Sequence, residues 1–338
     1  MIRTAIIGYG RSGQFLHGPG ILGNPSSYQM VAVTSQSANS LAKAEQDFGC
    51  SVYTDYQEML GEEDLDLVVI VTRNDQHAEM ACAVLSAGVS VVVTKPIGVN
   101  AEEVKEIYKL ADRVGKKVYP YFPAQFGSDY VRLKEIVDSG ELGEVFAIHR
   151  SMYGFATRND WQTLSEYGGG VLLNWGVHLI DPPLQLVAGR PLRVYGSTQQ
   201  LLNPGDCEDV FYAIIELEGG VRVHSEWTYS PNGREHWFIQ GTKGSVIVKN
   251  NIIEIHTGQP SCPEDPTVVS DMESGHVQYR REEVGEHVFG DPVEVYSEIA
   301  GDFKGESDYR VSSEMAMCVS QIIDAVKESS DKGTVIEL

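Results

Sequence analysis

The sequence predicts two domains: a doubly wound parallel α/β domain over residues 1–121, and an α+β domain with a large, mainly antiparallel open sheet over residues 122–338. Three observations predict this division. A chain of 338 residues usually forms about two domains. As far as residue 121, short apolar strands alternate with helices, which is typical of a parallel sheet covered on both faces. Beyond it, longer strands alternate apolar and polar residues, as in an antiparallel sheet with one free face.

The N-terminal elements follow from this alternation. The predicted strands are Arg3–Ile7, Gln29–Thr34, Leu67–Val71, Ser90–Thr94 and Lys117–Tyr121. The predicted helices are Asn39–Phe48, Asp75–Ala87 and Ala101–Val114, and another helix starts after Gly13. Parallel sheets of this kind bind ligands at the carboxyl ends of their strands. We therefore expect functional residues directly after these strands.

The C-terminal elements are expected to build the second sheet and its cover. The predicted helices are Asp129–Ser139, Val171–Val187 and Ser312–Lys327. The predicted strands are Glu144–Tyr153, Val210–Leu217, Val221–Trp227 and Thr334–Leu338, with hairpin turns at 242–244 and 250–251. The polar segment Asp265–Asp291 is expected to be a long loop. A free sheet face is a typical subunit interface.

The composition limits the partners. The net charge of −22 argues against nucleic acid or an anionic membrane as a partner. No apolar run is long enough to span a bilayer, and the first strand starts so close to Met1 that we expect no signal peptide. The five cysteines are scattered without a Cys-x-x-Cys pair, which favours reduced thiols and a cytoplasmic protein.

The motif Gly8-Tyr9-Gly10-Arg11-Ser12-Gly13 lies between the first strand and a helix. In this position, glycines allow a tight turn, a close approach of the backbone to a ligand, and close packing of helix on strand. The helix N-terminus offers N–H groups to a pyrophosphate. The motif therefore predicts a Rossmann domain that binds NAD or NADP, and a glycine-rich turn without a ligand is the alternative.

A polar stripe on an otherwise apolar helix indicates a second part of the site. Asn174, His178 and Asp181 fall at positions i, i+4 and i+7, so they share one helical face. Gly168-Gly169-Gly170 precedes this helix and lets the backbone pack closely. Unpaired buried polar groups are costly, so the stripe favours a functional site over core packing. A metal site is less well supported, because no third ligand is evident beside His178 and Asp181.

Lys95 ends an apolar strand and precedes Pro96, which favours an extended backbone at Lys95. Its side chain is therefore expected near the carboxyl edge of the sheet, where a nicotinamide would lie. Taken alone, Lys95 is better interpreted as an ordinary lysine at a strand end.

Four motifs in this order resemble the glucose–fructose oxidoreductase and inositol dehydrogenase family (Gfo/Idh/MocA). They are Gly8–Gly13, Thr72-Arg73-Asn74-Asp75-Gln76-His77, Thr94-Lys95-Pro96 and Gly168–Asp181. The resemblance covers nearly the whole chain. It implies a homodimer or homotetramer and a catalytic role for Lys95 and His178. It also implies cofactor contacts from Thr72, Arg73, Asn74, His77, Lys95 and Pro96.

The chain departs from the family pattern at several positions. Thr94 replaces the glutamate before Lys-Pro, Arg73 replaces a usual proline, and Pro123-Ala124-Gln125 replaces a frequent Asn-Arg-Arg. Asn174 stands where the family has an aspartate four residues before the catalytic histidine. Asn174 can bond a substrate hydroxyl but cannot take its proton, which leaves Asp181 as a possible orienting partner of His178.

The expected reaction is hydride transfer between a nicotinamide and a secondary alcohol or ketone. His178 would take the hydroxyl proton, and the Lys95 ammonium would stabilise the developing negative charge on that oxygen. Selectivity for NAD usually needs an acid at the end of the second strand, but this stretch is Ser35-Gln36-Ser37. With Arg11 and Arg73 on the same edge, the sequence favours NADP over NAD.

A small sugar, inositol or related polyol is the expected substrate. Tyr153, Arg158 and Trp161 precede the polar helix and suit hydroxyls and the apolar face of a sugar ring. Arg158 could instead hold a carboxylate, and each of these residues could equally pack in a surface loop. Two other functions stay open: NAD-dependent glycoside hydrolysis, which some family members perform, and a non-catalytic dinucleotide sensor that binds a partner protein.

Overall fold

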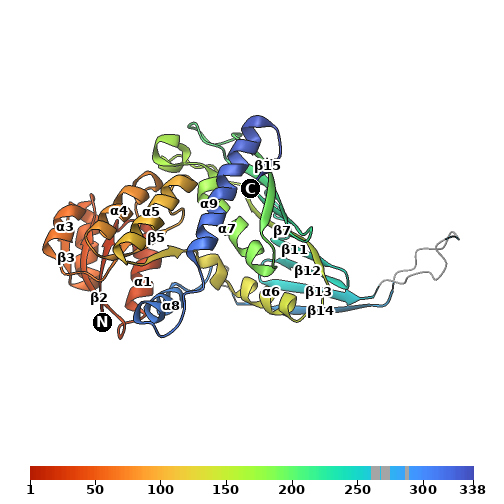
Figure 1. Cartoon of the computed structure of the whole chain (residues 1–338), viewed down its shortest axis with the longest axis horizontal. Coiled ribbons are helices and arrows are strands. Elements are labelled where there is room, and N and C mark those ends of the chain that lie inside the picture. The colour runs from red at the N-terminus through yellow and green to blue at the C-terminus, as the bar shows by residue number, and fades with distance from the viewer. Residues whose placement is uncertain (260–266, 268–274, 286–288) are drawn as a thin grey trace.

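The computed structural model contains two sheets that face each other across a layer of helices (Figure 1). It describes residues 1–259, 267, 275–285 and 289–338. The six-stranded N-terminal sheet is parallel throughout, in the order β3-β2-β1-β4-β5-β6. Its strands are β1 Ile2–Ile7, β2 Tyr28–Thr34, β3 Ser51–Tyr53, β4 Leu67–Ile70, β5 Ser90–Thr94 and β6 Val118–Tyr121. The strand order reverses between β1 and β4, where sheets of this kind bind dinucleotides.

Helices connect these strands much as the sequence predicts. They are the consecutive segments η1 Gly13–His17 and α1 Gly18–Leu22, followed by α2 Ala38–Phe48, α3 Tyr56–Glu62, α4 His77–Ser86 and α5 Ala101–Val114. β3 and α3 were not predicted, because a strand of three residues and a helix of seven are too short for a clear periodicity.

The second sheet has nine strands in the order β14-β13-β12-β11-β7-β10-β9-β8-β15. The strands are β7 Val145–Gly154, β8 Pro191–Gln199, β9 Val210–Leu217, β10 Arg222–Tyr229, β11 Trp237–Gly241, β12 Gly244–Lys249, β13 Ile252–Gly258, β14 Val277–Glu283 and β15 Ile336–Glu337. β7 and β10 pair in parallel and the other neighbours are antiparallel. The sheet is therefore mainly antiparallel, as predicted.

One face of this sheet is covered and the other is free. The helices α6 Ser128–Asp138, α7 Val171–Leu186 and α9 Ser313–Lys332 lie on the side that faces the first sheet (Figure 1). On β10, Val223 and Ser225 point to this side and are buried, as the alternation predicts. On the free face, the side chains of Tyr195 and Tyr212 are 46% and 42% exposed.

The prediction of a long loop over Asp265–Asp291 is wrong in part, because this segment contains β14, which pairs with β13. Its charged residues give no strand-like alternation in the sequence, but in the structure two of them form ion pairs with residues of other segments. Arg280 donates to Glu141 at 2.5 Å, and Glu282 accepts from Arg132 at 2.6 Å. The parts at 265–266, 268–274 and 286–288 lie outside the described residues.

The helix α8 Pro292–Lys304, which was not predicted, returns to the first sheet and packs on α1. Its Tyr296 is fully buried, with its hydroxyl 2.8 Å from His17 Nδ1. The Tyr28 hydroxyl donates to the Tyr296 carbonyl at 2.7 Å. A late segment of the chain thus completes the packing around the first helix after the glycine turn.

We expect Tyr296→Phe to lower the free energy of unfolding by about 1–3 kcal/mol, because His17 would lose its hydrogen bond in a fully buried position. His17 Nε2 is already buried without a hydrogen-bond partner among the residues that the structure describes. Urea denaturation measures the effect, with Tyr56→Phe as the control, because the Tyr56 hydroxyl donates to Glu79 at 3.5 Å in a solvent-exposed position. An unchanged midpoint for Tyr296→Phe would contradict this expectation.

Candidate active site

The glycine loop before α7 docks on the ends of the parallel strands. Asn74, just after β4, donates from Nδ2 to the carbonyl of Gly168 at 2.8 Å. A Cβ on Gly168 would lie 2.7 Å from Val99 Cγ1 and 2.9 Å from Asn74 Cβ, at a φ of +67°. Only glycine allows this approach, so the triple glycine brings α7 to the carboxyl edge of the first sheet.

The start of α7 is also held from the other side, by Glu208. The Glu208 carbonyl accepts from the Val171 N–H and its Oε1 accepts from the Leu172 N–H, both at 3.0 Å. A Cβ on Gly170 would overlap the Glu208 carboxyl group. Burial raises the pKa of this carboxyl. Glu208 thus caps α7, which has no capping side chain of its own at Gly170.

Lys95 and Asn174 bring the two halves of the site together. Lys95 Nζ donates to the Asn174 carbonyl at 2.6 Å and to Asn174 Oδ1 at 2.7 Å. Burial, together with the positive charge of Arg158, lowers the pKa of Lys95 to about 8. Asparagine supplies no negative charge against this effect, so Lys95 titrates near neutral pH.

His178 lies one helical turn after Asn174 and is 8% exposed. Its ring contacts Phe289 and Trp175, with ring centroids 5.1 and 5.7 Å away. Within the described part of the chain, His178 Nδ1 is buried without a hydrogen-bond partner. Burial and the cations Lys95 and Arg150 hold the pKa of His178 well below its usual value. The imidazole is therefore neutral at physiological pH and able to accept a proton.

Asp181, expected as an orienting partner of His178, has other hydrogen-bond partners. Gln125 Nε2 donates to its two oxygens at 3.1 and 2.9 Å, and Gln185 Nε2 donates at 3.3 Å. Burial raises the pKa of Asp181 to about 7. The structure therefore places Asp181 on the same helix as His178 but pairs it with side-chain amides.

The glycine turn leaves room for a ligand at one position. Gly8 has a φ of +93°, and a Cβ there would lie 2.5 Å from the Val71 carbonyl oxygen. A Cβ on Gly10 would meet nothing within 4 Å. This open backbone next to a helix start fits a pyrophosphate. Arg11 and Ser12 are exposed beside it, whereas the Tyr9 ring is buried and its hydroxyl donates to Asp47 at 2.8 Å.

The residues after β4 and β5 mainly form contacts that stabilise the loops at the carboxyl edge of the first sheet. His77 Nδ1 lies 2.6 Å from the Pro96 carbonyl oxygen and Nε2 lies 3.2 Å from that of Thr72, so the ring bridges the two loops. The Arg73 guanidinium lies 3.9 Å from the centre of the Tyr167 ring, next to the glycine loop. The arginine at this position thus adds a contact between the two halves of the site.

The end of β2 carries no carboxylate. The Gln36 side chain donates to the Thr54 carbonyl at 2.5 Å, and Ser37 Oγ caps α2 by accepting from the Ser40 N–H at 3.4 Å. Ser35 Oγ accepts from the Ser37 N–H at 3.2 Å. This stretch therefore presents hydroxyl and amide groups where selectivity for NAD usually needs an acid.

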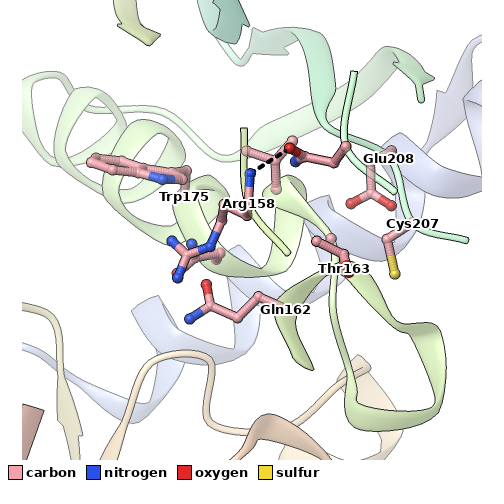
Figure 2. A pocket seen from close by; sticks show the side chains of 10 residues that line it. Arg158, Gln162, Thr163, Trp175, Cys207 and Glu208 are labelled. Atoms are coloured by element: carbon pink, nitrogen blue, oxygen red, sulfur yellow. Dashed lines mark hydrogen bonds between the residues drawn. The ribbon is translucent and has the colours of Figure 1, made fainter. Parts of the chain in front are cut away.

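A pocket opens beside Asn174 (Figure 2). Its lining residues are Arg158, Gln162, Thr163, Gly170, Val171, Asn174, Trp175, Asn203, Cys207 and Glu208. Of the predicted substrate contacts, Arg158 and Asn174 line this pocket, whereas Lys95, Tyr153, Trp161 and His178 are not among its lining residues. The Tyr153 hydroxyl donates to Glu226 at 2.7 Å.

Sequence reasoning missed the aromatic wall of this pocket. Trp175 lies beside the side chains of the pocket in Figure 2, and its ring stacks on Trp227 with centroids 4.4 Å apart. Trp175 directly follows Asn174 on the predicted helix, and this position could have indicated that it lies near the site. Gln162, Asn203 and Glu208 gave none, because they come from loops without a motif.

Comparisons with known proteins identify the family. A model described as an oxidoreductase family with an NAD-binding Rossmann fold matches residues 2–122, and the GFO/IDH/MocA C-terminal domain matches residues 130–247. The chain belongs to the Gfo/Idh/MocA family of oxidoreductases. This confirms the resemblance and the fold that the four motifs predict.

Relatives within the Gfo/Idh/MocA family span the whole chain. The uncharacterized oxidoreductase YdgJ of Escherichia coli is 28% identical over 97% of this chain and 96% of its own length. The scyllo-inositol 2-dehydrogenase (NADP(+)) IolW of Bacillus subtilis is 24% identical over 100% of this chain and 96% of its own. The structure of the WlbA dehydrogenase from Bordetella pertussis in complex with NADH and UDP-GlcNAcA shares the fold. It has a TM-score of 0.85 at 21% identity and covers 100% of this chain and 97% of that one.

Among the residues that the structure describes, no group of three His, Cys, Asp or Glu side chains is placed to hold a metal ion. In the same part of the chain, no helix is long and apolar enough to cross a membrane.

We expect Asn174→Asp to raise the pKa of Lys95 above its value of about 8, because a carboxylate beside the ammonium favours the charged form. The measurement is the pH dependence of Lys95 acetylation, followed by peptide mass spectrometry. Asn232→Asp, on an exposed loop, is the control and should leave the Lys95 titration in place. Identical curves for Asn174→Asp and the wild type would contradict the role given to Asn174.

Proposed function

We propose that this protein transfers hydride between NAD(P) and a secondary alcohol or ketone of a sugar, inositol or related polyol. One observation carries the proposal: the Lys95 ammonium binds Asn174, which lines the pocket and lies one helical turn before the neutral, buried His178. The first 121 residues would hold the cofactor, and the remainder would shape the substrate pocket.

The residues present suit both partners of such a reaction. The turn at Gly8–Gly13 would hold the pyrophosphate, with the open backbone at Gly10 facing it. When bound, the nicotinamide exchanges a hydride with the carbinol carbon of the substrate. His178 takes the hydroxyl proton during oxidation and returns it during reduction. Lys95 Nζ, which keeps a third N–H beyond the two given to Asn174, donates to the same oxygen and stabilises its negative charge.

We infer that NADP is preferred over NAD. The stretch Ser35-Gln36-Ser37 has no acid to repel a 2′-phosphate, and its hydroxyls and the exposed start of α2 offer donors. The relative IolW is named for NADP(+), whereas WlbA was crystallised with NADH. Because these two relatives point to different cofactors, the inferred preference for NADP rests on the residues at the end of β2.

The test is to titrate the protein with NADPH and NADH, and then to follow hydride transfer with a panel of sugars, inositols and uronates. We expect tighter binding of NADPH and turnover of at least one substrate. His178→Ala should lower that turnover by about 100-fold or more, because the proton acceptor is lost. His256→Ala, on β13 of the second sheet, is the matched control.

Three outcomes would count against parts of this proposal. Near-normal turnover by His178→Ala would remove His178 from the mechanism. Tighter binding of NADH would reverse the cofactor preference. Cleaved sugar without net oxidation of NADPH or reduction of NADP would show the glycoside hydrolysis that some family members perform.

We also propose that the free face of the second sheet joins copies of this chain into a homodimer or homotetramer. This face exposes Tyr195, Tyr212 and Ile214, and His149 stacks on His224 with ring centroids 4.3 Å apart. Covering such aromatic side chains would remove apolar surface from water. Light scattering should give two or four times the chain mass of 37.2 kDa, and a monomer would contradict the proposal.

A further inference from the structure

Arg158 brings an unused donor into the substrate pocket. Its Nη2 donates to Asp160 at 2.9 Å, and its backbone N–H donates to Asn203 Oδ1 at 2.7 Å, so both ends of the residue are fixed. Its Nε is buried and, in the part of the chain that the structure describes, has no hydrogen-bond partner. Buried polar groups are normally paired, so this donor indicates a ligand atom.

An unused acceptor lies in the same pocket. Gln162 Oε1 is buried and likewise has no partner among the described residues. In Figure 2 the side chains of Gln162 and Arg158 lie side by side at the pocket, with Trp175 nearby. A ligand that satisfies both groups must carry an acceptor for the guanidinium and a donor, such as a hydroxyl, for the amide oxygen.

The pocket gathers positive charge at this end. Asn174 lines it and binds the Lys95 ammonium, and Arg158 is near enough for its charge to lower the pKa of Lys95. Among the described residues, Lys95 forms no ion pair, and the only carboxylate that Arg158 pairs with is the 43%-exposed Asp160. Two cations that meet here within a chain of net charge −22 are a local feature that favours an anion.

The opposite end of the pocket has a different character. In Figure 2 the Glu208 carboxyl group lies away from the guanidinium of Arg158, and one of its oxygens already accepts from the Leu172 N–H. A carboxylate ligand would be repelled at this end, while a sugar hydroxyl could donate to Glu208. The pocket therefore distinguishes the two ends of a ligand that is anionic at one end and hydroxylated at the other.

We propose that the substrate is a sugar acid, whose carboxylate binds Arg158 and Lys95 and whose hydroxyls face Gln162 and Glu208. This inference rests on the proposed hydride transfer and names its substrate class. Asn174, which replaces the family's aspartate, fits the proposal because an aspartate there would repel the substrate carboxylate. The apolar face of the sugar ring would pack on Trp175.

The test compares matched pairs of substrates in the NADPH- or NADP-loaded protein. The pairs are D-glucuronate with D-glucose and D-galacturonate with D-galactose, and glucose 6-phosphate tests a phosphate in place of a carboxylate. The quantity is the ratio of kcat/KM for the acid to that for its neutral partner. We expect the ratio to exceed one by about tenfold or more, the usual value of a hydrogen bond to a charged group.

Three variants test the roles of Arg158 and Asn174. Arg158→Gln should lower the ratio by about tenfold or more, because the charged donor is lost, and Arg158→Lys should restore part of it. Asn174→Asp should also lower the ratio, because it adds a negative charge beside Lys95. Arg190→Gln, an exposed arginine paired with Glu218, is the matched control and should leave the ratio unchanged. Thermal melting of each variant shows whether it is folded.

The outcomes separate this inference from the proposed function. Hydride transfer with equal kcat/KM for acid and neutral sugars, or a ratio unaffected by Arg158→Gln, would overturn the sugar-acid substrate and leave the oxidoreductase in place. A preference for glucose 6-phosphate alone would replace the carboxylate with a phosphate. NADPH binding without transfer to or from any sugar would contradict the proposed function itself.

Discussion

The hydrogen bonds from Lys95 to Asn174 join the two halves of the active site, and the remaining geometry depends on them. Lys95 directly follows β5 in the sheet that carries the glycine turn, whereas Asn174 lies on α7 one turn before His178. The contacts from Asn74 to Gly168 and from Arg73 to Tyr167 hold the same junction. Because all of them cross between the halves, any slide of α7 along the sheet edge would separate the proton acceptor from the cation.

Burial sets opposite roles for the two titratable groups at this junction. It disfavours charge on both, yet Lys95 stays a cation over much of the physiological range, with a pKa of about 8, whereas His178 is held neutral. A neutral base beside a cation is the pairing that oxidation of an alcohol needs, since one group takes the proton and the other stabilises the oxygen. Each role follows from the environment that the fold builds around the residue.

The sequence predicted elements that have a clear period, and missed elements whose residues find partners far away in the chain. Continuous apolar strands such as β4 and β5, and the polar stripe of α7, were visible because their pattern is local. β14 was hidden, because its charged residues pair with Glu141 and Arg132 on other elements. The bond from Gln125 to Asp181 could not be predicted either, because Gln125 lies 56 positions away in a short 3-10 helix. Sequence motifs were enough to select Lys95 and His178 as candidate site residues. The residues that line the pocket could be identified only from the three-dimensional structure.

Asn174 connects the departure from the family pattern to the chemistry of the pocket. Replacing an aspartate with asparagine keeps an oxygen for Lys95 but removes the negative charge that would balance it. Arg158 then adds a second cation, with a buried Nε that no described group accepts. A protein can leave such charges in a partly desolvated pocket when its ligand supplies the counter-charge. The carboxylate of the proposed sugar-acid substrate would supply it, and repulsion from Glu208 would set the direction in which that substrate binds.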